Sequence, residues 1–180
     1  NLGLSEARAP YVARMDADDA SHPDRLRLQC DFLDDNPEVG LISSLVEYWS
    51  EEGEIRKGYA KYVDWTNELL SDADFRLRRF VESPFAHPSV AFRKSVAERF
   101  GGYRDGPFPE DYELWLRLLD VGAGANLPEP LVELFQGADR ISGAHPRGGL
   151  KFALRAKWKN RNGGVLKGAP WYLFWWQLRG

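Results

Sequence analysis

The sequence contains a single cysteine, Cys30, so the chain can form neither an internal disulfide bond nor a metal cluster held by several thiolates. A reducing compartment suits such a composition. The apolar neighbours Leu28 and Phe32 favour a small buried thiol over a reactive one. Any chemistry of this protein is therefore expected from other residue types.

Long apolar runs are also missing. No stretch reaches the roughly 18 consecutive apolar residues that a transmembrane helix needs. The first residues, Asn1 to Leu4, have none of the features of a secretory signal peptide. Because the chain opens without methionine and in the middle of a structural pattern, we expect a fragment of a longer, cytoplasmic protein.

Acidic residues are absent from the end of the chain. Residues 140–180 contain nine Lys or Arg and no Asp or Glu, whereas the remainder carries 15 basic and 27 acidic residues. Four tryptophans accompany the basic side chains between residues 148 and 180. We predict a main domain over residues 1–139 and a basic, Trp-rich helical extension over residues 140–180.

The basic extension has two interpretations. Cations beside aromatic rings suit an anionic membrane surface, where each cation contributes roughly 1 kcal/mol, so residues 148–180 would hold the protein peripherally at the inner face of the membrane. The alternative is a helix that packs its aromatic side chains on the main domain. Nucleic acid is disfavoured as a partner, because the acidic body would be repelled by phosphates.

The 180-residue chain suits one domain with an appendage, and 43% hydrophobic with 28% charged residues is typical of a soluble globular protein. Apolar periodicity and Pro or Gly boundaries predict alternating helices and strands, and therefore an α/β fold with ligands at the carboxyl ends of strands. The predicted helices span residues 1–9, 23–35, 64–81, 94–100 and 110–120. The predicted strands span residues 11–15, 39–49, 89–93 and 131–135, and residues 55–63 could be a short strand or a loop.

Three carboxylates fall within four residues at Asp16, Asp18 and Asp19, directly after a predicted strand. Their mutual repulsion at neutral pH requires a compensating charge, and Mg²⁺ or Mn²⁺ prefers carboxylate oxygens together with substrate phosphates. The spacing differs from a calcium-binding EF-hand loop, because no glycine lies at the turn. The alternative is that Asp18, Asp19 or Ser21 caps the helix that begins near Pro23.

Glu110 and Asp111 begin the predicted helix 110–120, after a loop rich in Pro and Gly. Acidic residues in a first turn contribute roughly 0.3–1 kcal/mol through the helix dipole, which is the simpler explanation of the local pattern. A carboxylate at a rigid junction of loop and helix is also a good general base, because it can stay within hydrogen-bond reach of a hydroxyl.

Several other polar residues have two interpretations. His87 lies in a loop, where a structural hydrogen bond or a contact with an acceptor would both suit an imidazole. His22 could be a metal ligand or a solvated loop residue. Arg93 and Arg117 could bind a phosphate or a carboxylate, or could be surface charges. Trp115 faces the apolar side of the predicted helix and is expected in the core.

Four sequence blocks, taken in order over about residues 1–135, resemble family 2 of the glycosyltransferases. The blocks are NLGL…AR…YVARMDADD…P.RL..Q, then HPSV..R…GGY, then EDYELWLR, and finally LPEPLV. The resemblance implies a metal-dependent, inverting enzyme with a GT-A-like mixed sheet flanked by helices, truncated at its N-terminus. Residues 1–139 would then be a partial GT-A catalytic domain.

The resemblance also implies a role for individual residues. Asp16 would face the nucleoside of a nucleotide-diphosphate sugar, Asp18 would bind the Mn²⁺ or Mg²⁺ ion that bridges the diphosphate, and Asp19 would support either contact. Asp111, with Glu110 beside it, would deprotonate the acceptor hydroxyl in a single displacement with inversion, while the metal stabilises the leaving diphosphate.

The second block implies that His87 and Arg93 lie on the side of a saccharide or lipid-linked acceptor. Two departures from the family pattern are clear. The βαβ units that hold the nucleotide base in family members would precede Asn1. After Leu131 and Val132 the chain continues to Gln136-Gly137, where family members often carry a histidine near the diphosphate.

Two other functions compete with glycosyl transfer. Asp-x-Asp motifs also serve Mg²⁺-dependent phosphoryl transfer, but such enzymes place small residues such as Gly-Thr after the nucleophilic Asp, and Ala20-Ser21-His22-Pro23 differs. A non-catalytic module that keeps the fold and binds a partner or a membrane is the other alternative, since the first nucleotide-binding units would be missing.

Overall fold

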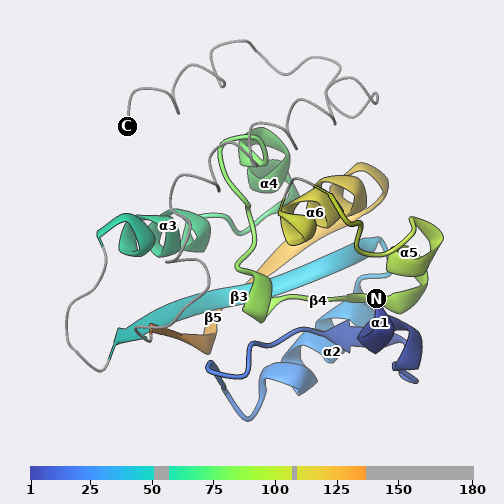
Figure 1. Ribbon diagram of the computed structural model, residues 1–180, viewed down its shortest axis with the longest axis horizontal. Coiled ribbons are helices and arrows are strands. Elements are labelled where there is room, and N and C mark those ends of the chain that lie inside the picture. The colour runs from blue at the N-terminus through green and yellow to red at the C-terminus, as the bar shows by residue number, and fades with distance from the viewer. Residues whose placement is uncertain (51–56, 107–108, 137–180) are drawn as a thin grey trace.

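The computed structural model describes residues 1–50, 57–106 and 109–136. The predicted extension over residues 140–180, with its proposed membrane-binding stretch 148–180, lies outside the described residues. Within them, one five-stranded mixed sheet carries helices on both faces (Figure 1). This confirms the predicted α/β architecture.

The centre of the sheet is a long parallel pair of strands, β3 (Val39–Ser50) and β5 (Ala123–Gln136). Three short strands pair antiparallel around it, and the strand order is β1-β4-β3-β5-β2. These are β1 (Tyr11–Ala13), β2 (Ala20–Ser21) and β4 (Ala91–Arg93). Because β1 and β2 lie at opposite edges, residues 14–19 cross from one edge of the sheet to the other.

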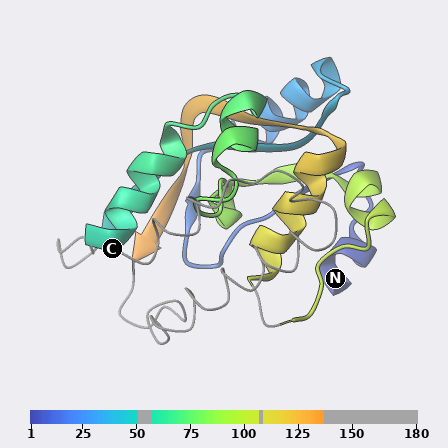
Figure 2. The same ribbon diagram turned by 90° about the horizontal axis from the view of Figure 1, so that it is seen from above.

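Helices cover both faces of this sheet. One face carries α2 (Arg25–Asp35), and the other carries α3 (Lys57–Asn67), α4 (Asp72–Arg78) and α6 (Glu110–Val121) (Figure 1, Figure 2). The shorter elements are α1 (Leu2–Glu6), α5 (Lys94–Arg99) and a 3-10 turn at His87–Ser89. Within the described residues, no helix has both the length and the apolar character needed to cross a bilayer.

Alternate residues of β3 supply two cores, because successive strand side chains point to opposite faces. Leu41 belongs to the core that contains Trp115 of α6, whereas Ile42 belongs to the core that contains Leu33 of α2. Trp115 is fully buried, which confirms its predicted place in the core.

The prediction of one helix over residues 64–81 is wrong, because a helix cap divides the segment. The Ser71 hydroxyl accepts a hydrogen bond from the Asp74 backbone N–H at 3.3 Å, and the Asp74 carboxylate accepts one from the Ser71 backbone N–H at 2.9 Å. This reciprocal capping box begins a new helix, α4, at Asp72. Residues 57–63, for which the sequence left strand and loop open, form the first part of α3.

β5 is longer than the predicted strand 131–135 and begins at Ala123, directly after Gly122 ends α6. Gly124 lies in this strand. A Cβ atom on Gly124 would lie 2.7 Å from Cδ2 of Leu119. The glycine therefore lets α6 pack close against β5, which no local pattern reveals.

Candidate functional site

The segment that crosses the sheet between β1 and β2 carries the three predicted acidic residues. Carboxylate oxygens of Asp16, Asp18 and Asp19 all lie within 4.8 Å of one another, and we refer to these three residues as the carboxylate cluster. Asp16 forms an ion pair with Arg14 at 2.5 Å. Oxygen atoms at these distances are suitable ligands for one hard divalent cation.

Asp19 is anchored to the end of β5. Its side chain is buried, and Oδ1 accepts a hydrogen bond of 2.9 Å from the backbone N–H of Phe135 near the end of β5. Asp18 is exposed and Asp16 is partly exposed. The cluster therefore has one carboxylate fixed to the sheet and two that a ligand can reach.

The alternative that Asp18, Asp19 or Ser21 caps the following helix is wrong. The residue at the N-cap of α2 is Asp24, and its side chain makes no capping hydrogen bond. His22 is exposed, and its Nδ1 accepts a hydrogen bond from the Asp24 backbone N–H at 3.2 Å. His22 lies outside the group of side chains that could share a metal ion among the described residues.

Arg25, the first residue of α2, holds the backbone that leads into the cluster. Its buried guanidinium donates to the carbonyl oxygens of Arg14 at 2.8 Å and Val90 at 3.3 Å. Gln29 donates from the next turn to the carbonyl of Ser89 at 2.8 Å. Burial lowers the pKa of Arg25 to about 10, while the nearby charge of Asp19 acts in the opposite direction.

Asp111 lies in the first turn of α6, on the face of the sheet that α3, α4 and α6 cover, and its side chain is partly buried (Figure 1). Burial raises the pKa of Asp111 to about 6, against the stabilising effect of hydrogen bonds from the backbone at the helix start. The neighbouring charge of Glu110 raises this pKa further, and the charge of Arg14 lowers it. Such a carboxylate is ionised at pH 7 and is more basic than an exposed aspartate.

His87 lies beside Asp111. Its Nδ1 is 4.0 Å from Oδ2 of Asp111, and its Nε2 is 3.2 Å from the hydroxyl of Tyr103. Burial, together with the charge of Arg14, lowers the pKa of His87 to about 4, so the ring is neutral at pH 7 and forms no ion pair with Asp111 there. The contact with Tyr103 confirms the structural hydrogen bond that was one interpretation of this residue.

Arg93 is tied to the backbone rather than exposed as a surface charge. Its guanidinium donates to the carbonyl oxygens of Val39 at 2.9 Å, Leu33 at 2.5 Å and Asn36 at 3.1 Å. These bonds join the end of α2 and the start of β3 to β4. Its predicted place on the acceptor side stays a prediction.

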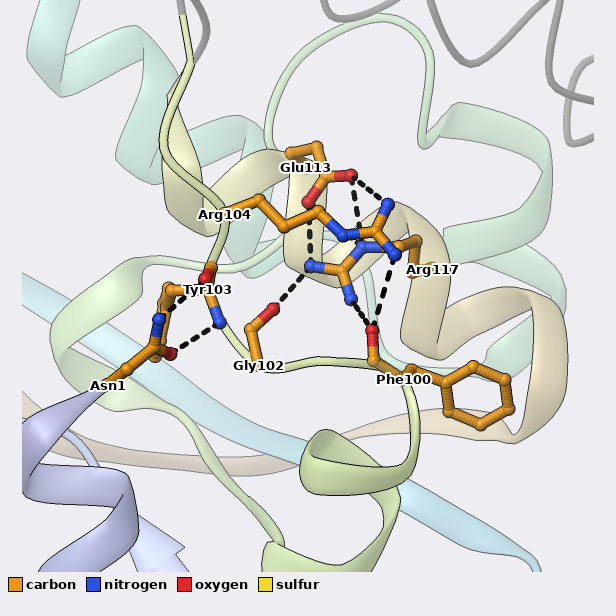
Figure 3. Close-up of polar contacts among 7 residues, drawn as sticks. All are labelled: Asn1, Phe100, Gly102, Tyr103, Arg104, Glu113 and Arg117. Carbon is orange, nitrogen blue, oxygen red and sulfur yellow. Dashed lines mark hydrogen bonds and ion pairs between the residues drawn. The ribbon is translucent and has the colours of Figure 1, made fainter.

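Arg117 was also considered as a surface charge, and the structure corrects this. Its guanidinium is buried and pairs with Glu113 one turn earlier on α6, at 2.7 Å between Nη2 and Oε2. The same guanidinium donates to the carbonyl oxygens of Phe100 at 2.5 Å and Gly102 at 2.6 Å (Figure 3). A carboxylate partner, the other interpretation, is therefore correct for Arg117.

The turn held by Arg117 leads directly to Tyr103. Gly101 and Gly102 have φ angles of 85° and 60°, which only glycine adopts readily. Asn1 then holds Tyr103, since its side chain donates to the Tyr103 carbonyl at 2.7 Å and accepts from the Tyr103 N–H at 2.9 Å (Figure 3). Helix α6 thus carries Asp111 and also braces the turn that supplies the partner of His87.

The guanidinium of Arg14 pairs with the carboxylate cluster, and its charge also acts on Asp111. Arg14 pairs with Asp16, and its charge lowers the pKa values of Asp111, His87 and Tyr103. Nδ1 of His87 lies 4.0 Å from Oδ2 of Asp111, and the charges of both Arg14 and Asp16 act on His87, which supports one shared region for Asp111 and the carboxylate cluster. Sequence analysis did not single out Arg14 or Tyr103, because only three-dimensional proximity relates them to Asp111.

Comparison with known proteins gives consistent findings. Residues 1–101 match the family model for glycosyl transferase family 2. The chain is 36% identical over 158 residues to the UDP-Gal:alpha-D-GlcNAc-diphosphoundecaprenol beta-1,3-galactosyltransferase of Escherichia coli, covering 86% of this chain and 53% of the relative. It is 34% identical over 143 residues to the amylovoran biosynthesis glycosyltransferase AmsE of Erwinia amylovora, covering 79% of this chain and 51% of the relative.

A solved structure extends the comparison to the fold. The mannosyltransferase PcManGT of Pyrobaculum calidifontis, in complex with GDP-Man and Mn²⁺, aligns with a TM-score of 0.57 at 18% identity, covering 96% of this chain and 44% of that one. This likeness confirms the predicted GT-A-like sheet flanked by helices. The chain spans about half the length of the curated relatives it matches.

Proposed function

Because the chain belongs to glycosyl transferase family 2, we propose that it transfers a sugar from a nucleotide-diphosphate donor to an acceptor hydroxyl, with inversion at the anomeric carbon. The observation that supports this proposal best is the shared region of the carboxylate cluster and Asp111, both of which lie within electrostatic reach of Arg14. The proposed metal-dependent, inverting transfer would use a metal-binding carboxylate on the leaving-group side of the reacting carbon and a basic carboxylate on the other side.

The carboxylate cluster is the donor side of the proposed site. Three carboxylates within 4.8 Å fit a hard divalent cation, and exposed Asp18 is the proposed ligand of Mn²⁺ or Mg²⁺. Such a cation would neutralise charge on the departing diphosphate. Asp16 would contact the nucleoside side of the donor. Asp19, tied to Phe135, would keep the segment in place against the end of β5.

Asp111 is the proposed general base on the acceptor side. An ionised carboxylate with a pKa of about 6 can accept the proton of an acceptor hydroxyl at pH 7 more readily than an ordinary aspartate. As the proton moves to Oδ of Asp111, the acceptor oxygen forms its bond to the anomeric carbon and the bond to the diphosphate breaks. Glu110 is exposed beside Asp111, and its negative charge adds to the effect of burial in raising the pKa of Asp111.

The acceptor is proposed to be a saccharide or a lipid-linked sugar, with His87 and Arg93 on its side of the site. The E. coli relative is named for an acceptor carried on diphosphoundecaprenol, which supports a lipid-linked acceptor here. Such an acceptor would place the protein in the cytoplasm at the inner face of the membrane. Residues 148–180 would supply the membrane contact.

Binding of nucleoside diphosphates tests the donor side. We expect the chain to bind at least one of UDP, GDP, ADP, CDP or dTDP in the presence of Mn²⁺, and to lose this binding on removal of Mn²⁺ or on Asp18→Ala. Asp24→Ala is the matched control, since Asp24 carries a half-exposed carboxylate that is close to the cluster in sequence but lies outside it. Binding that ignores both the metal and Asp18→Ala would reject the proposed donor site.

A further inference from the structure

Arg14 is fixed in place by its backbone but not by its whole side chain. Its backbone N–H donates to the Val90 carbonyl at 2.9 Å, and its own carbonyl accepts from Arg25 at 2.8 Å. Its side chain reaches Asp16 through Nη2 at 2.5 Å. The Cα position of Arg14 is therefore set by the fold, while the direction of the guanidinium depends on Asp16.

The other terminal nitrogen of this guanidinium is poorly satisfied. Among the described residues, Nη1 of Arg14 is buried and has no hydrogen-bond partner. A buried donor without an acceptor is unfavourable, and such groups in a native structure need an explanation. The pairing with Asp16 thus uses only part of the binding capacity of Arg14.

The pairing does offset a real repulsion. The three carboxylates of the cluster lie within 4.8 Å of one another, and Arg14 supplies a positive charge in direct contact with one of them. A divalent cation at the cluster would perform the same task with twice the charge. A cation bound at Asp18 would therefore weaken the pairing of Arg14 with Asp16, because like charges close together repel.

Once it leaves Asp16, the guanidinium remains close to the proposed reaction centre, since the backbone of Arg14 is held by Val90 and Arg25. It lies within electrostatic reach of Asp111, His87 and Tyr103, the residues around the proposed reaction centre. A guanidinium binds phosphate oxygens through two parallel N–H donors, so both Nη1 and Nη2 would then be satisfied.

We propose that Arg14 is the internal counter-ion of the carboxylate cluster, which pairs with Asp16 while the cluster holds no metal and moves to a phosphate oxygen of the substrate when a divalent cation occupies the cluster. This inference rests on the proposed function, since it assumes that the cluster receives both a cation and a diphosphate. It assigns to Arg14 the task of offsetting part of the negative charge of the three carboxylates and, with a cation bound, of contacting the diphosphate.

Two binding constants measured on Arg14→Gln test the inference, because they are expected to change in opposite directions. With Mn²⁺ alone, removal of the competing charge should raise the affinity for the ion about threefold to tenfold. With a nucleoside diphosphate at saturating Mn²⁺, loss of a charged hydrogen bond should lower the affinity about tenfold. Calorimetry measures both constants on the same preparation.

Two further variants serve as controls. Arg8→Gln removes the same charge at an exposed position close in sequence and should leave both constants unchanged. Arg14→Lys keeps the charge but not the two-donor geometry, so Mn²⁺ affinity should stay near that of the wild type while diphosphate affinity falls less than in Arg14→Gln.

The outcomes separate the inference from the proposed function. A nucleoside diphosphate affinity that does not fall, or an Mn²⁺ affinity that does not rise, in Arg14→Gln overturns the inference alone. A parallel loss of both affinities indicates damage to the fold and overturns it equally. Absence of Mn²⁺-dependent nucleotide binding in the wild-type chain rejects the proposed donor site itself, and the role of Arg14 with it.

Discussion

Nδ1 of His87 lies 4.0 Å from Oδ2 of Asp111, and the two side chains do not form an ion pair at neutral pH. The pKa of His87 is lowered to about 4, chiefly by burial, and that of Asp111 is raised to about 6 by the same cause. Near pH 7 an ionised carboxylate therefore lies beside a neutral imidazole. This state leaves Asp111 able to accept a proton, and several testable consequences depend on it.

Transfer should depend on the ionisation of Asp111. Because the base must be deprotonated, kcat/KM should be constant above pH 7 and should fall about tenfold per pH unit below the pKa of about 6. Asp111→Asn should lower kcat by a factor of about 10² to 10⁴ while nucleoside diphosphate binding is retained. The measurement is a pH series of initial rates. Full turnover by Asp111→Asn would remove Asp111 from the mechanism.

The ionised carboxylate of Asp111 should lower the free energy of unfolding at neutral pH. The folded-state pKa of Asp111, about 6, lies above the ordinary value of 3.8, so the folded state binds more protons than the unfolded state between these values. Its contribution to stability is therefore favourable at low pH and is lost as the pH rises towards 6. Asp111→Asn should raise the free energy of unfolding at pH 8 by about 1–3 kcal/mol, and by much less at pH 4.

Urea denaturation at the two pH values measures this effect. Asp105→Asn is the matched control, because Asp105 is exposed and is not among the groups that shift the pKa of Asp111. An equal change at pH 4 and pH 8 for Asp111→Asn would contradict the assigned origin of the effect.

Removal of one partner from the buried Glu113–Arg117 ion pair should destabilise the fold strongly. Arg117→Met leaves the Glu113 carboxylate, which is 2% exposed, facing Arg104 alone at 3.4 Å, so the free energy of unfolding should fall by about 3–5 kcal/mol. The double substitution Glu113→Leu with Arg117→Met should recover much of that loss. Arg27→Met, which breaks exposed pairs on α2, should change little.

Chemical denaturation of the single and double variants checks this prediction. A double variant that is less stable than Arg117→Met would mean that the pair contributes mainly through its bonds to Phe100 and Gly102. In that case the turn leading to Tyr103 depends on the guanidinium itself.

The close approach of α6 and β5 should make Gly124 intolerant of a side chain. A Cβ there would lie 2.7 Å from Leu119 Cδ2 and 3.1 Å from ring carbons of Phe75 and Phe85, so Gly124→Ala should destabilise by about 1–3 kcal/mol. Gly58→Ala in α3, where a Cβ meets open space, should instead stabilise by about 0.5–1 kcal/mol. Thermal melting curves of the two variants measure the changes in stability. Shifts of the melting temperature in the same direction for Gly124→Ala and Gly58→Ala would contradict the predicted contacts.

Local patterns predicted most elements of the described fold. Apolar periodicity placed α2, β3 and α6 within one or two residues, since each buries one face or both faces of a regular element. The error at residues 64–81 arose because apolar spacing continued across Ser71, although Ser71 and Asp74 carry the signal of a new helix. The interpretation of Arg117 as a surface charge failed because its partners come from a distant turn.

By itself, the sequence determined which chemistry is available: one thiol, three carboxylates in one segment and a pair at the start of a helix. It also determined the α/β pattern, because helix and strand periodicity depend on neighbours along the chain. Only the tertiary structure decided that Arg14 pairs with Asp16 while its charge also acts on Asp111, and that burial beside His87 raises the pKa of Asp111. Burial and electrostatic interactions depend on distances through space, and those distances exist only once β1, β4 and α6 have packed together.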